Sequence, residues 1–355
     1  MSRLVFFHPD PLWDGLSRLY VELARALRAR GVTVAIACPP ASPMASAVGD
    51  LDVLPFESRA AWVSDTLRFA TTLREFKADA VLVSDDAPHR MAAWALRRNG
   101  RGIVLRRMRS AVATPITLGT RIAVRIVPTW FMHSSGTEAK AAQPVSGLRG
   151  RLVADIAVDP ERLERVVPSL APPGITTVVV VTDGAAHRAT AAALRTIAAM
   201  RSRGHPLRTL LMGRPHDVSE VRVHATAIGL GDALSIVGDP LDRASLLAGA
   251  DVVWITADRD DGGVAALDAM ALGRPVIATR GTMAERYVAD GETGMIAERD
   301  DALATAALLT TLQADPAWTA RMGEAARDAV RTRRGLADAV DAVMSALGST
   351  ARTGI

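Results

Sequence analysis

The segment over residues 250–298 constrains the fold of this chain more than any other part of it. Residues 250–256 (ADVVWIT) form a short apolar run rich in β-branched side chains, which is typical of a buried parallel strand. Gly262 and Gly263 can then open a helix, and Pro275 begins the next apolar run. Strand, glycine turn, helix and strand make one βαβ step, in which free N–H groups at the helix start face the carboxyl end of the sheet and favour an anion.

Two carboxylates accompany this helix start. Asp260 is expected in the loop before the helix, and Asp268 about a turn and a half into it. Carboxylate oxygens accept hydrogen bonds from sugar hydroxyls, while the N–H groups of Gly262, Gly263 and Val264 suit phosphates, so the pattern favours a nucleotide-sugar. The alternative is that Asp260 is a solvated loop residue and Asp268 a solvated helix position.

Asp260, the seven residues after it, Asp268 and the following AMALGRPVIATRGTMAERYVADGETGMIAERD resemble the donor site of the GT-B glycosyltransferases of family 4. Those enzymes typically carry Glu-x7-Glu, Ala-Met-Ala, a Pro-Val strand and Asp-Gly-Glu-Thr-Gly. The resemblance is specific over residues 250–300 and weaker over 22–31 (ELARALRARG) and 158–163 (VDPERL). It implies a retaining, metal-independent transfer of a sugar from a nucleotide-sugar to an acceptor.

The fold that the resemblance implies is α/β, with two Rossmann-like, doubly wound parallel-sheet domains facing across a cleft. Alternating apolar and helical stretches in both halves agree with it, and 355 residues suffice for two domains. We expect an N-terminal, acceptor-side domain over residues 1–165 and a donor-binding domain over 166–335, with the proline-rich start of the latter as a hinge. The resemblance also implies a last helix over 336–350 that crosses back to the first domain. The expected strands are 4–7, 32–38, 80–84, 102–106, 176–181, 207–212, 233–237, 250–256 and 275–278, and a helix followed by a strand is expected near 122–128.

Several positions depart from the family pattern. The basic pair that grips the donor diphosphate is replaced by Asp183 and Arg188; Arg188 can still bind phosphate, but Asp183 reverses the charge. A histidine expected after the fourth strand is absent, and Arg106, Arg107 and Arg109 occupy that place. Both motif glutamates are aspartates, which are shorter by one methylene. These changes keep open a second hypothesis, a degenerate GT-B protein that binds a nucleotide or a partner subunit without turnover.

Candidates for the acceptor side lie near the N-terminus. His8 ends the first strand, where a titratable group in a Rossmann-like sheet faces the crevice. Gly15 stands where the family has two glycines that open the first helix, and Arg18 lies one turn further on. The resemblance implies that these three residues contact the acceptor, and that His8 and Asp260 are the catalytic candidates. The alternatives are a structural histidine and an exposed helix arginine.

Positive charge is concentrated in the first part of the chain. Residues 1–150 hold 20 Lys and Arg against 12 Asp and Glu, and the remainder holds 22 against 26. Residues 87–137 contain nine arginines and no acidic residue, including Arg106, Arg107 and Arg109. Such a surface would attract a phosphorylated or membrane-associated acceptor, although arginine is also this chain's usual cation. We expect no nucleic-acid partner, because the run has few interleaved aromatics and no known module.

The sequence contains no uncharged apolar stretch of about 18 residues and no signal-peptide pattern. Its single cysteine, Cys38, excludes a disulfide within the chain. We expect a cytoplasmic protein, with the inner membrane surface as a peripheral location. No cofactor and no metal site are expected, since Asp85 and Asp86 are adjacent and read as a loop.

Overall fold

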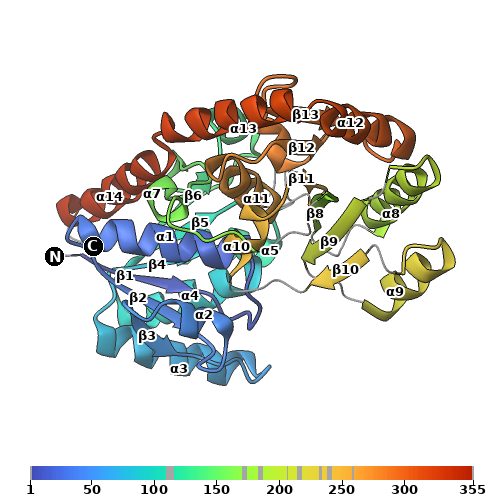
Figure 1. Cartoon of the computed structure of the whole chain (residues 1–355). Helices are drawn as coiled ribbons and strands as arrows, with labels where there is room; N and C mark the ends of the chain where they lie inside the picture. Colours follow the sequence, from blue (N-terminus) through green and yellow to red (C-terminus); the bar gives the residue numbers. More distant parts are fainter. Residues whose placement is uncertain are drawn as a thin grey trace. The chain divides into compact units, whose positions relative to one another are not determined.

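The computed structural model in Figure 1 divides into two compact α/β units. It describes residues 2–108, 116–169, 174–182, 187–205, 207–213, 218–231, 234–237, 242–257 and 260–353. The first unit comprises Met1–Trp13, Ser17–Ala157 and Arg334–Ile355, and the second comprises Asp14–Leu16 and Val158–Arg333. The division at Ala157 and Val158 comes before the proline-rich segment that the sequence suggested as the hinge.

The first unit is built on a seven-stranded parallel sheet with the order β3-β2-β1-β4-β5-β6-β7. Its strands are β1 (Arg3–Phe7), β2 (Thr33–Cys38), β3 (Asp52–Pro55), β4 (Ala80–Val83), β5 (Ile103–Arg107), β6 (Thr129–His133) and β7 (Gly150–Val153). Its helices are α1 (Gly15–Ala29), α2 (Pro43–Ala47), α3 (Trp62–Phe76), α4 (Asp86–Asn99), α5 (Leu118–Ile126), α6 (Gly136–Ala141) and α14 (Gly335–Thr353).

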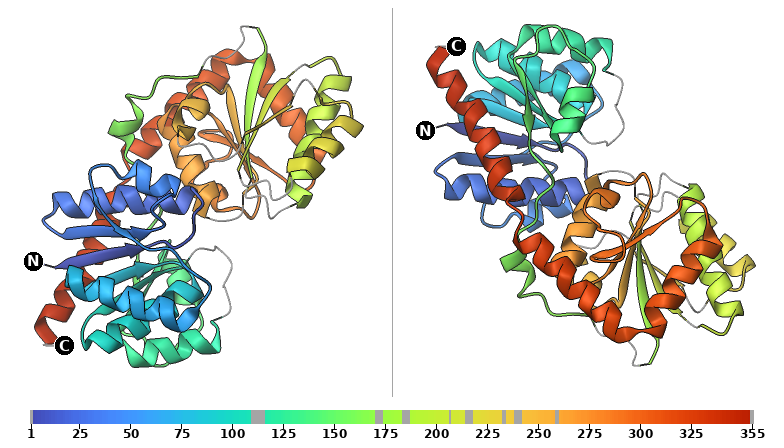
Figure 2. Two further views of the ribbon diagram at one scale, coloured as in Figure 1. Left: turned by 90° about the horizontal axis from the view of Figure 1, so that it is seen from below. Right: turned by 90° about the horizontal axis from the view of Figure 1, so that it is seen from above.

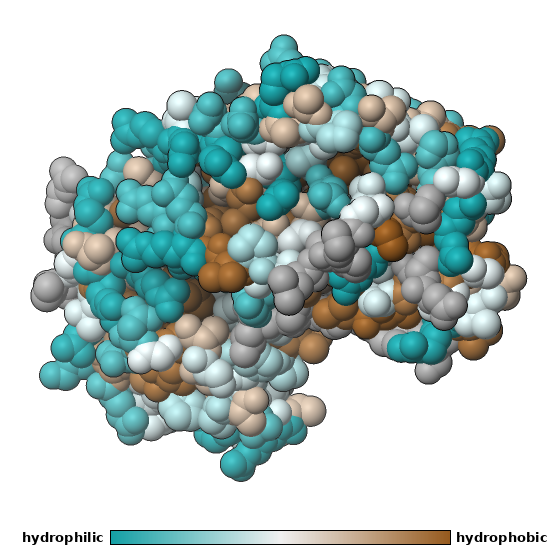
Figure 3. All heavy atoms as spheres, in the orientation of Figure 1, coloured by the Kyte–Doolittle hydropathy of each residue, from teal (hydrophilic) through white to brown (hydrophobic). Residues whose placement is uncertain are grey.

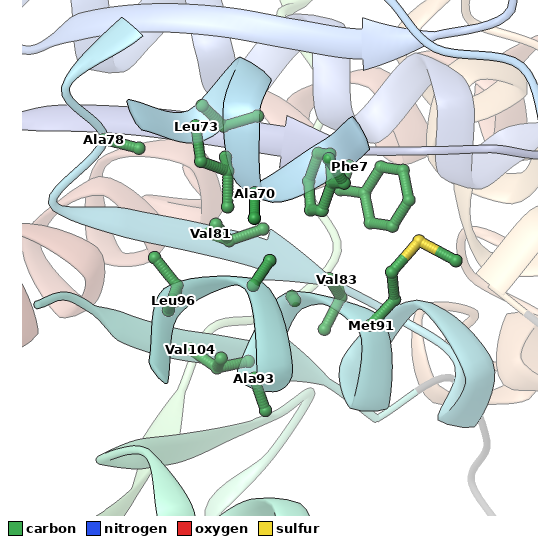
Figure 4. Packing of buried hydrophobic residues seen from close by; sticks show 14 of the residues in the cluster. Phe7, Ala70, Leu73, Ala78, Val81, Val83, Met91, Ala93, Leu96 and Val104 are labelled. Atoms are coloured by element: carbon green, nitrogen blue, oxygen red, sulfur yellow. The ribbon is translucent and has the colours of Figure 1, made fainter. Parts of the chain in front are cut away.

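One face of this sheet packs against α3, α4 and α5 (Figure 4). Alternate residues of the central strands, such as Phe7, Val81 and Val104, point to this layer, as the period of a strand requires. Leu73 and Leu96 fill the space from the helices. Because both faces of a doubly wound sheet are covered, its central strands are apolar throughout.

The last helix, α14, belongs to the first unit although it ends the chain. It contacts β7, and Figure 2 shows it in dark red against this unit. Arg30 and Asp341 form an ion pair of 3.2 Å between α1 and α14 at its surface. A Cβ on Gly335 would lie 3.2 Å from the Ile156 carbonyl oxygen. The start of α14 therefore packs against the backbone that follows β7.

The second unit contains a six-stranded parallel sheet with the order β10-β9-β8-β11-β12-β13. Its strands are β8 (Thr176–Thr182), β9 (Leu207–Gly213), β10 (Leu234–Val237), β11 (Val252–Ile255), β12 (Val276–Thr279) and β13 (Gly294–Ala297). Its helices are α7 (Pro160–Leu163), α8 (His187–Ser202), α9 (Val218–Ala227), α10 (Arg243–Ala248), α11 (Asp260–Ala271), the 3₁₀ helix η1 (Met283–Arg286), α12 (Ala302–Ala314) and α13 (Pro316–Arg331). Both sheets therefore follow the 3-2-1-4-5-6 order of a Rossmann fold.

The expected pair of parallel-sheet units is confirmed, and all the expected strands occur within a few residues of their places. The strands β3, β7 and β13 were not expected from the sequence. β3 and β7 are edge strands of four residues in which exposed or half-buried positions predominate, so they lack an apolar run.

The surface of the molecule is mixed in polarity. Figure 3 shows hydrophilic residues over much of the visible face, with hydrophobic residues between them. Within the described part of the chain, the helices are all too short or too polar to span a lipid bilayer.

Candidate functional site

The carboxyl edge of the second sheet brings the starts of two helices together. β8 and β11 are hydrogen-bonded neighbours, and the strand order reverses between them, since β9 and β10 lie on one side and β12 and β13 on the other. In open α/β sheets, ligands bind in the crevice at this reversal point. α8 follows β8 and α11 follows β11, so the N-termini of both helices lie at this edge. The arrangement suits an anion with more than one phosphate.

The start of α8 is fixed to the end of β8 by a pair of threonines. Thr182 Oγ1, at the last residue of the strand, lies 3.2 Å from Thr190 Oγ1 in the first turn of the helix. Arg188 is the second residue of α8, and its side chain is exposed. An exposed guanidinium beside the free N–H groups of a helix start can bind phosphate oxygens. Asp183 lies outside the described residues, so its effect on this charge stays a prediction.

The start of α11 differs from the sequence expectation. The helix begins at Asp260, so the placement of Asp260 in a loop was wrong, and the two glycines lie within the first turn. A Cβ on Gly262 would lie 2.3 Å from the Ala257 carbonyl oxygen and 3.2 Å from Ile255 Cγ2. Glycine is therefore required for this turn to pack directly on the end of β11.

Asp268 is fully buried within α11. The alternative that it is a solvated helix position is therefore wrong. The residues from Val264 to Ala271 are all buried, so α11 is enclosed on every side and has no solvent-facing side. A carboxylate is costly to bury unless it is hydrogen-bonded, which sets Asp268 apart in an otherwise apolar helix.

His8 lies just beyond the end of β1, where the strand order of the first sheet reverses between β1 and β4. Its side chain is buried. Nε2 lies 3.1 Å from Ser17 Oγ on α1, and the ring packs edge-on against Tyr20 at 6.0 Å between centroids. The backbone N–H of His8 donates to the Ala37 carbonyl. His8 is thus held firmly at the edge where the sequence predicted it, and its role in catalysis stays a prediction.

Gly15 is the first residue of α1, in agreement with a helix that opens at this glycine. Arg18 follows in the first turn and is buried, with 7% of its surface exposed. The alternative of an exposed helix arginine is therefore wrong. Contact of either residue with an acceptor stays a prediction.

The sequence suggested that Arg106 lies on a basic surface, and this prediction was wrong. It is the fourth residue of β5, only 4% exposed, and its Nη2 lies 2.5 Å from Asp86 Oδ1. Nη1 donates to Thr120 Oγ1 at 3.0 Å, and the guanidinium lies over the Phe131 ring at 5.7 Å from its centroid. Asp86 itself is the first residue of α4, preceded by the N-cap residue Asp85, so the expected loop here was also wrong. The pair joins β5 to the starts of α4 and α5.

Arg107 is likewise buried inside the first unit. Its Nη1 donates to the Ala154 carbonyl at 2.8 Å and its Nη2 to Ser134 Oγ at 3.3 Å. Strand-end arginines turn inward here because carbonyl, hydroxyl and carboxylate acceptors surround them. Arg109 lies outside the described residues. The remaining basic surface of residues 87–137 consists of the exposed Arg97, Arg98, Arg101, Arg121 and Arg125, with Arg90 half-buried.

Two buried histidines of the first unit, His89 and His133, have strongly lowered pKa values. Burial, and then the positive charge of Arg106, lower the pKa of His89 to about 3, although Asp86 acts in the opposite direction. Burial and the charge of Arg151 lower the pKa of His133 to about 4. Burial alone would raise the pKa of Asp86, but Arg106 and hydrogen bonds from Thr120 and Thr117 outweigh it, so the pKa lies below its ordinary value. Both imidazoles are neutral near pH 7.

Sequence reasoning missed two residues that shape these edges. Ser17 is the hydrogen-bond partner of His8, and its only signal was its position in the first turn of the helix that Gly15 opens. Gly213 ends β9 with φ +139°, and a Cβ there would lie 1.7 Å from the Thr182 carbonyl oxygen. Gly213 follows the apolar run of β9 directly, and a glycine at a strand end is the sequence signal for such a close approach between two strands.

Metal-ligating side chains are not grouped in the described part of the chain: no three or more His, Cys, Asp or Glu residues are placed there to hold one ion. The expectation of a site without a metal or cofactor stays a prediction.

The sequence matches known families in both halves. Residues 177–329 match the family described as glycosyl transferases group 1, and residues 13–107 match glycosyltransferase family 4. D-inositol 3-phosphate glycosyltransferase of Xylanimonas cellulosilytica is 34% identical over 122 residues, which are 34% of this chain and 29% of that protein. N-acetyl-alpha-D-glucosaminyl L-malate synthase of Bacillus anthracis is 28% identical over 121 residues, 34% of this chain and 32% of that protein. The matches thus span about a third of these relatives' length.

Solved structures resemble the chain over nearly its whole length. Anabaena Alr3699/HepE in complex with UDP and glucose superposes with a TM-score of 0.80 at 16% identity, covering 98% of this chain and 100% of that one. A glycosyltransferase from Rickettsia africae superposes with a TM-score of 0.76 at 14% identity, covering 98% of both chains. At these identities the likeness concerns the fold, and it confirms the predicted fold class.

Proposed function

Because the chain belongs to the group 1 and family 4 glycosyltransferases, we propose that it transfers a sugar from a nucleotide-sugar donor to an acceptor. The observation that carries this proposal is the pair of helix starts at the reversal point of the second sheet. Arg188 is exposed at one of them, and Gly262 permits the close packing of the other. Two converging sets of N–H groups and a guanidinium suit the diphosphate of such a donor.

The negative charge of the departing nucleoside diphosphate is the main electrostatic demand of this reaction. In our proposal the N–H groups of Gly262, Gly263 and Val264, together with Arg188, stabilise that charge. Asp260 orients the transferred sugar, and Asp268 accepts a hydrogen bond from the ribose. We propose retention at the anomeric carbon and no metal or cofactor, in line with the family.

The donor in this proposal is a nucleoside diphosphate sugar. Solved structures of Alr3699/HepE, which share this fold, contain UDP, UDP with glucose, or UDP-glucose. A non-catalytic nucleotide-binding protein is not favoured, because the relatives are named as glycosyltransferases or as a synthase of a glycosylated product.

For the acceptor we propose a phosphorylated or membrane-associated molecule that is bound by the first unit. His8 lies at the carboxyl edge of its sheet, and Arg18 lies in the first turn of α1, the helix that Gly15 opens. The name of one relative, D-inositol 3-phosphate glycosyltransferase, specifies a phosphorylated polyol. Arg106 and Arg107 contribute to this site only by holding its framework, because their side chains are engaged within the first unit.

The outer face of α4 and α5 supports a peripheral membrane location. It exposes Trp94 (44%), Leu118 (75%) and Ile122 (46%) on two helices that pack side by side. The exposed arginines of the same helices are Arg97, Arg98, Arg121 and Arg125. Apolar and aromatic side chains next to exposed arginines on the same helices can bind an anionic bilayer surface through both burial and charge.

The test is transfer by the full chain with UDP-, GDP- and ADP-sugars, each offered with phosphorylated polyol and lipid acceptors. Nucleoside diphosphate release and product mass are followed together. We expect one donor to be consumed with a matching glycosylated product, and Asp268→Ala to abolish turnover while the protein remains folded. Binding of no nucleotide, together with consumption of no donor, would refute the donor site.

A further inference from the structure

A pocket lies at the amino edge of the second sheet, opposite the edge that carries the helix starts described above. Its volume is about 750 Å³, which is in the range of small-molecule sites. Thr176 and Val252 are the first residues of β8 and β11, and Pro275 directly precedes β12. All three line the pocket, together with residues of α12 and α13. The amino and carboxyl ends of a parallel sheet lie on opposite edges, so this pocket is separate from the proposed donor site.

Two arginines mark this pocket. Arg274 and Arg327 both line it, and both also line a smaller adjoining pocket of about 240 Å³. The Arg327 guanidinium lies against Gly273, where a Cβ would be 2.2 Å from Nη2, and it donates to the Leu272 carbonyl at 3.2 Å. Arg274 follows Gly273 directly in the chain. The fold therefore holds two positive charges together at the end of α11.

Neither guanidinium of this pair is neutralised by a carboxylate at ion-pair distance within the described residues. Burial lowers the pKa of Arg274, Asp251 raises it, and the positive charge of Arg327 lowers it further. Arg331, one turn beyond Arg327 on α13, is different: it forms an ion pair of 2.6 Å with Glu164. Asp251 lies beyond ion-pair distance and offsets only part of this positive charge, and half-buried charges are screened less than exposed ones, so the pair still favours an anion.

The pocket wall also has unused hydrogen-bonding capacity. Nε of Arg274 and Oε1 of Gln313 are both buried and have no hydrogen-bond partner in the part of the chain that the structure describes. Such groups are rare in native structures and are commonly completed by water or a ligand. Asp251 and Glu324 lie at the exposed rim, where their carboxylates accept hydrogen bonds from hydroxyl groups. The lining thus combines a cationic centre with acceptors around it.

We propose that this pocket binds a small organic phosphate that also carries hydroxyl groups, with Arg274 and Arg327 on the phosphate and Gln313, Asp251 and Glu324 on the hydroxyls. A guanidinium matches phosphate oxygens bidentately, and the acceptors select a hydroxylated molecule over a simple anion. The site goes beyond the proposed transfer and does not depend on it, because it lies on the other edge of the sheet.

The test is calorimetric titration of the full chain with inorganic phosphate, glucose 6-phosphate and glucose. We expect glucose 6-phosphate to bind more tightly than phosphate, and glucose to bind no more than weakly. Arg274→Gln should weaken glucose 6-phosphate binding about tenfold or more, since a charge-assisted contact is lost. Arg321→Gln, an exposed arginine on α13 that does not line the pocket, should leave binding unchanged.

A second variant tests the pocket independently, in case Arg274→Gln fails to fold. Ala320→Phe places a ring in the pocket from α13 without removing either arginine, and it should also abolish binding of glucose 6-phosphate. Competition with a nucleotide distinguishes the two edges of the sheet: saturation with UDP, GDP or ADP should leave glucose 6-phosphate binding intact. The proposal would be overturned if a nucleotide competed with glucose 6-phosphate, or if Arg274→Gln and Ala320→Phe both bound it as tightly as the wild type. Absence of binding by the wild type up to about 10 mM glucose 6-phosphate would also overturn it.

Discussion

Arg106 and Asp86 form a close ion pair, with 2.5 Å between Nη2 and Oδ1, that connects the end of β5 to the first residue of α4. His89 lies one turn further along α4, fully buried, with Nδ1 at 3.3 Å from Arg106 Nη1. A proton on this imidazole would face the guanidinium charge in an apolar interior. Burial of His89, together with the neighbouring guanidinium, therefore makes the first unit sensitive to acid.

We expect His89 to reduce the free energy of unfolding as the pH falls from about 6.5 towards 3. Its pKa is about 3 in the folded chain against an ordinary value of 6.5, so within this window the unfolded chain binds a proton that the folded chain does not. Protonation therefore favours unfolding, by about 1.4 kcal/mol for each pH unit. Urea unfolding at pH 7 and pH 5 should show a smaller loss of stability in His89→Gln than in the wild type. The exposed His224→Gln serves as the control, and an equal loss in all three proteins would contradict the prediction.

Arg188→Ala should weaken nucleotide binding about tenfold or more without lowering stability, because the side chain is exposed and its contact is to the ligand. Arg188→Lys should recover part of the affinity, as a point charge without the bidentate geometry. Arg195→Ala, also exposed and two turns further along α8, is the matched control. Calorimetric titration with nucleoside diphosphates measures the difference, and equal affinities for both alanine variants would remove Arg188 from the site.

Gly262→Ala should destabilise the second unit by about 1–3 kcal/mol and weaken nucleotide binding. The added Cβ would lie 2.3 Å from the Ala257 carbonyl oxygen, so the first turn of α11 must move off β11. Gly231→Ala is a control in the same unit, since its Cβ would meet none of the described residues within 4 Å. Denaturant midpoints report the stability, and a Gly262→Ala protein as stable as the control would show that the turn accommodates a side chain.

The α4 and α5 face should bind vesicles that contain an anionic lipid and bind neutral vesicles much less. Arg121→Gln with Arg125→Gln should reduce the partition coefficient several-fold for each charge removed, at about 1 kcal/mol per arginine. Leu118→Ser with Ile122→Ser should reduce binding to anionic vesicles through the lost apolar contact. Co-sedimentation measures both effects, with Val223→Ser as a control because Val223 is 70% exposed in the second unit. Equal binding to anionic and neutral vesicles would contradict the prediction that this face binds an anionic membrane surface.

The elements that the sequence predicts best are those whose pattern is complete within a short segment. Four consecutive valines in β8 are buried on both faces, and this continuous run identifies a central parallel strand without further information. The β11 to β12 step was predictable for the same reason, apart from the start of α11. That start depends on whether Asp260 continues the helix, which local signals do not decide.

The side-chain environments at the candidate site were less predictable, because they depend on residues distant in the chain. Arg106 pairs with Asp86 and Thr120, and no local pattern indicates that a strand-end arginine will turn inward to meet them. A carboxylate on a helix is usually solvated, yet helices on several sides bury α11, and Asp268 with it, completely. Tertiary packing, rather than helix periodicity, decides which carboxylate meets solvent.

The membership of α14 in the first unit has a consequence for synthesis on the ribosome. The first unit requires residues from both ends of the chain, whereas nearly all of the second comes from the continuous segment Val158–Arg333. Domains generally fold as units while the chain emerges. The sheet of the first unit therefore leaves the exit tunnel early but lacks α14 until the whole second unit has been synthesised, so the later-made unit is the first that can fold to completion.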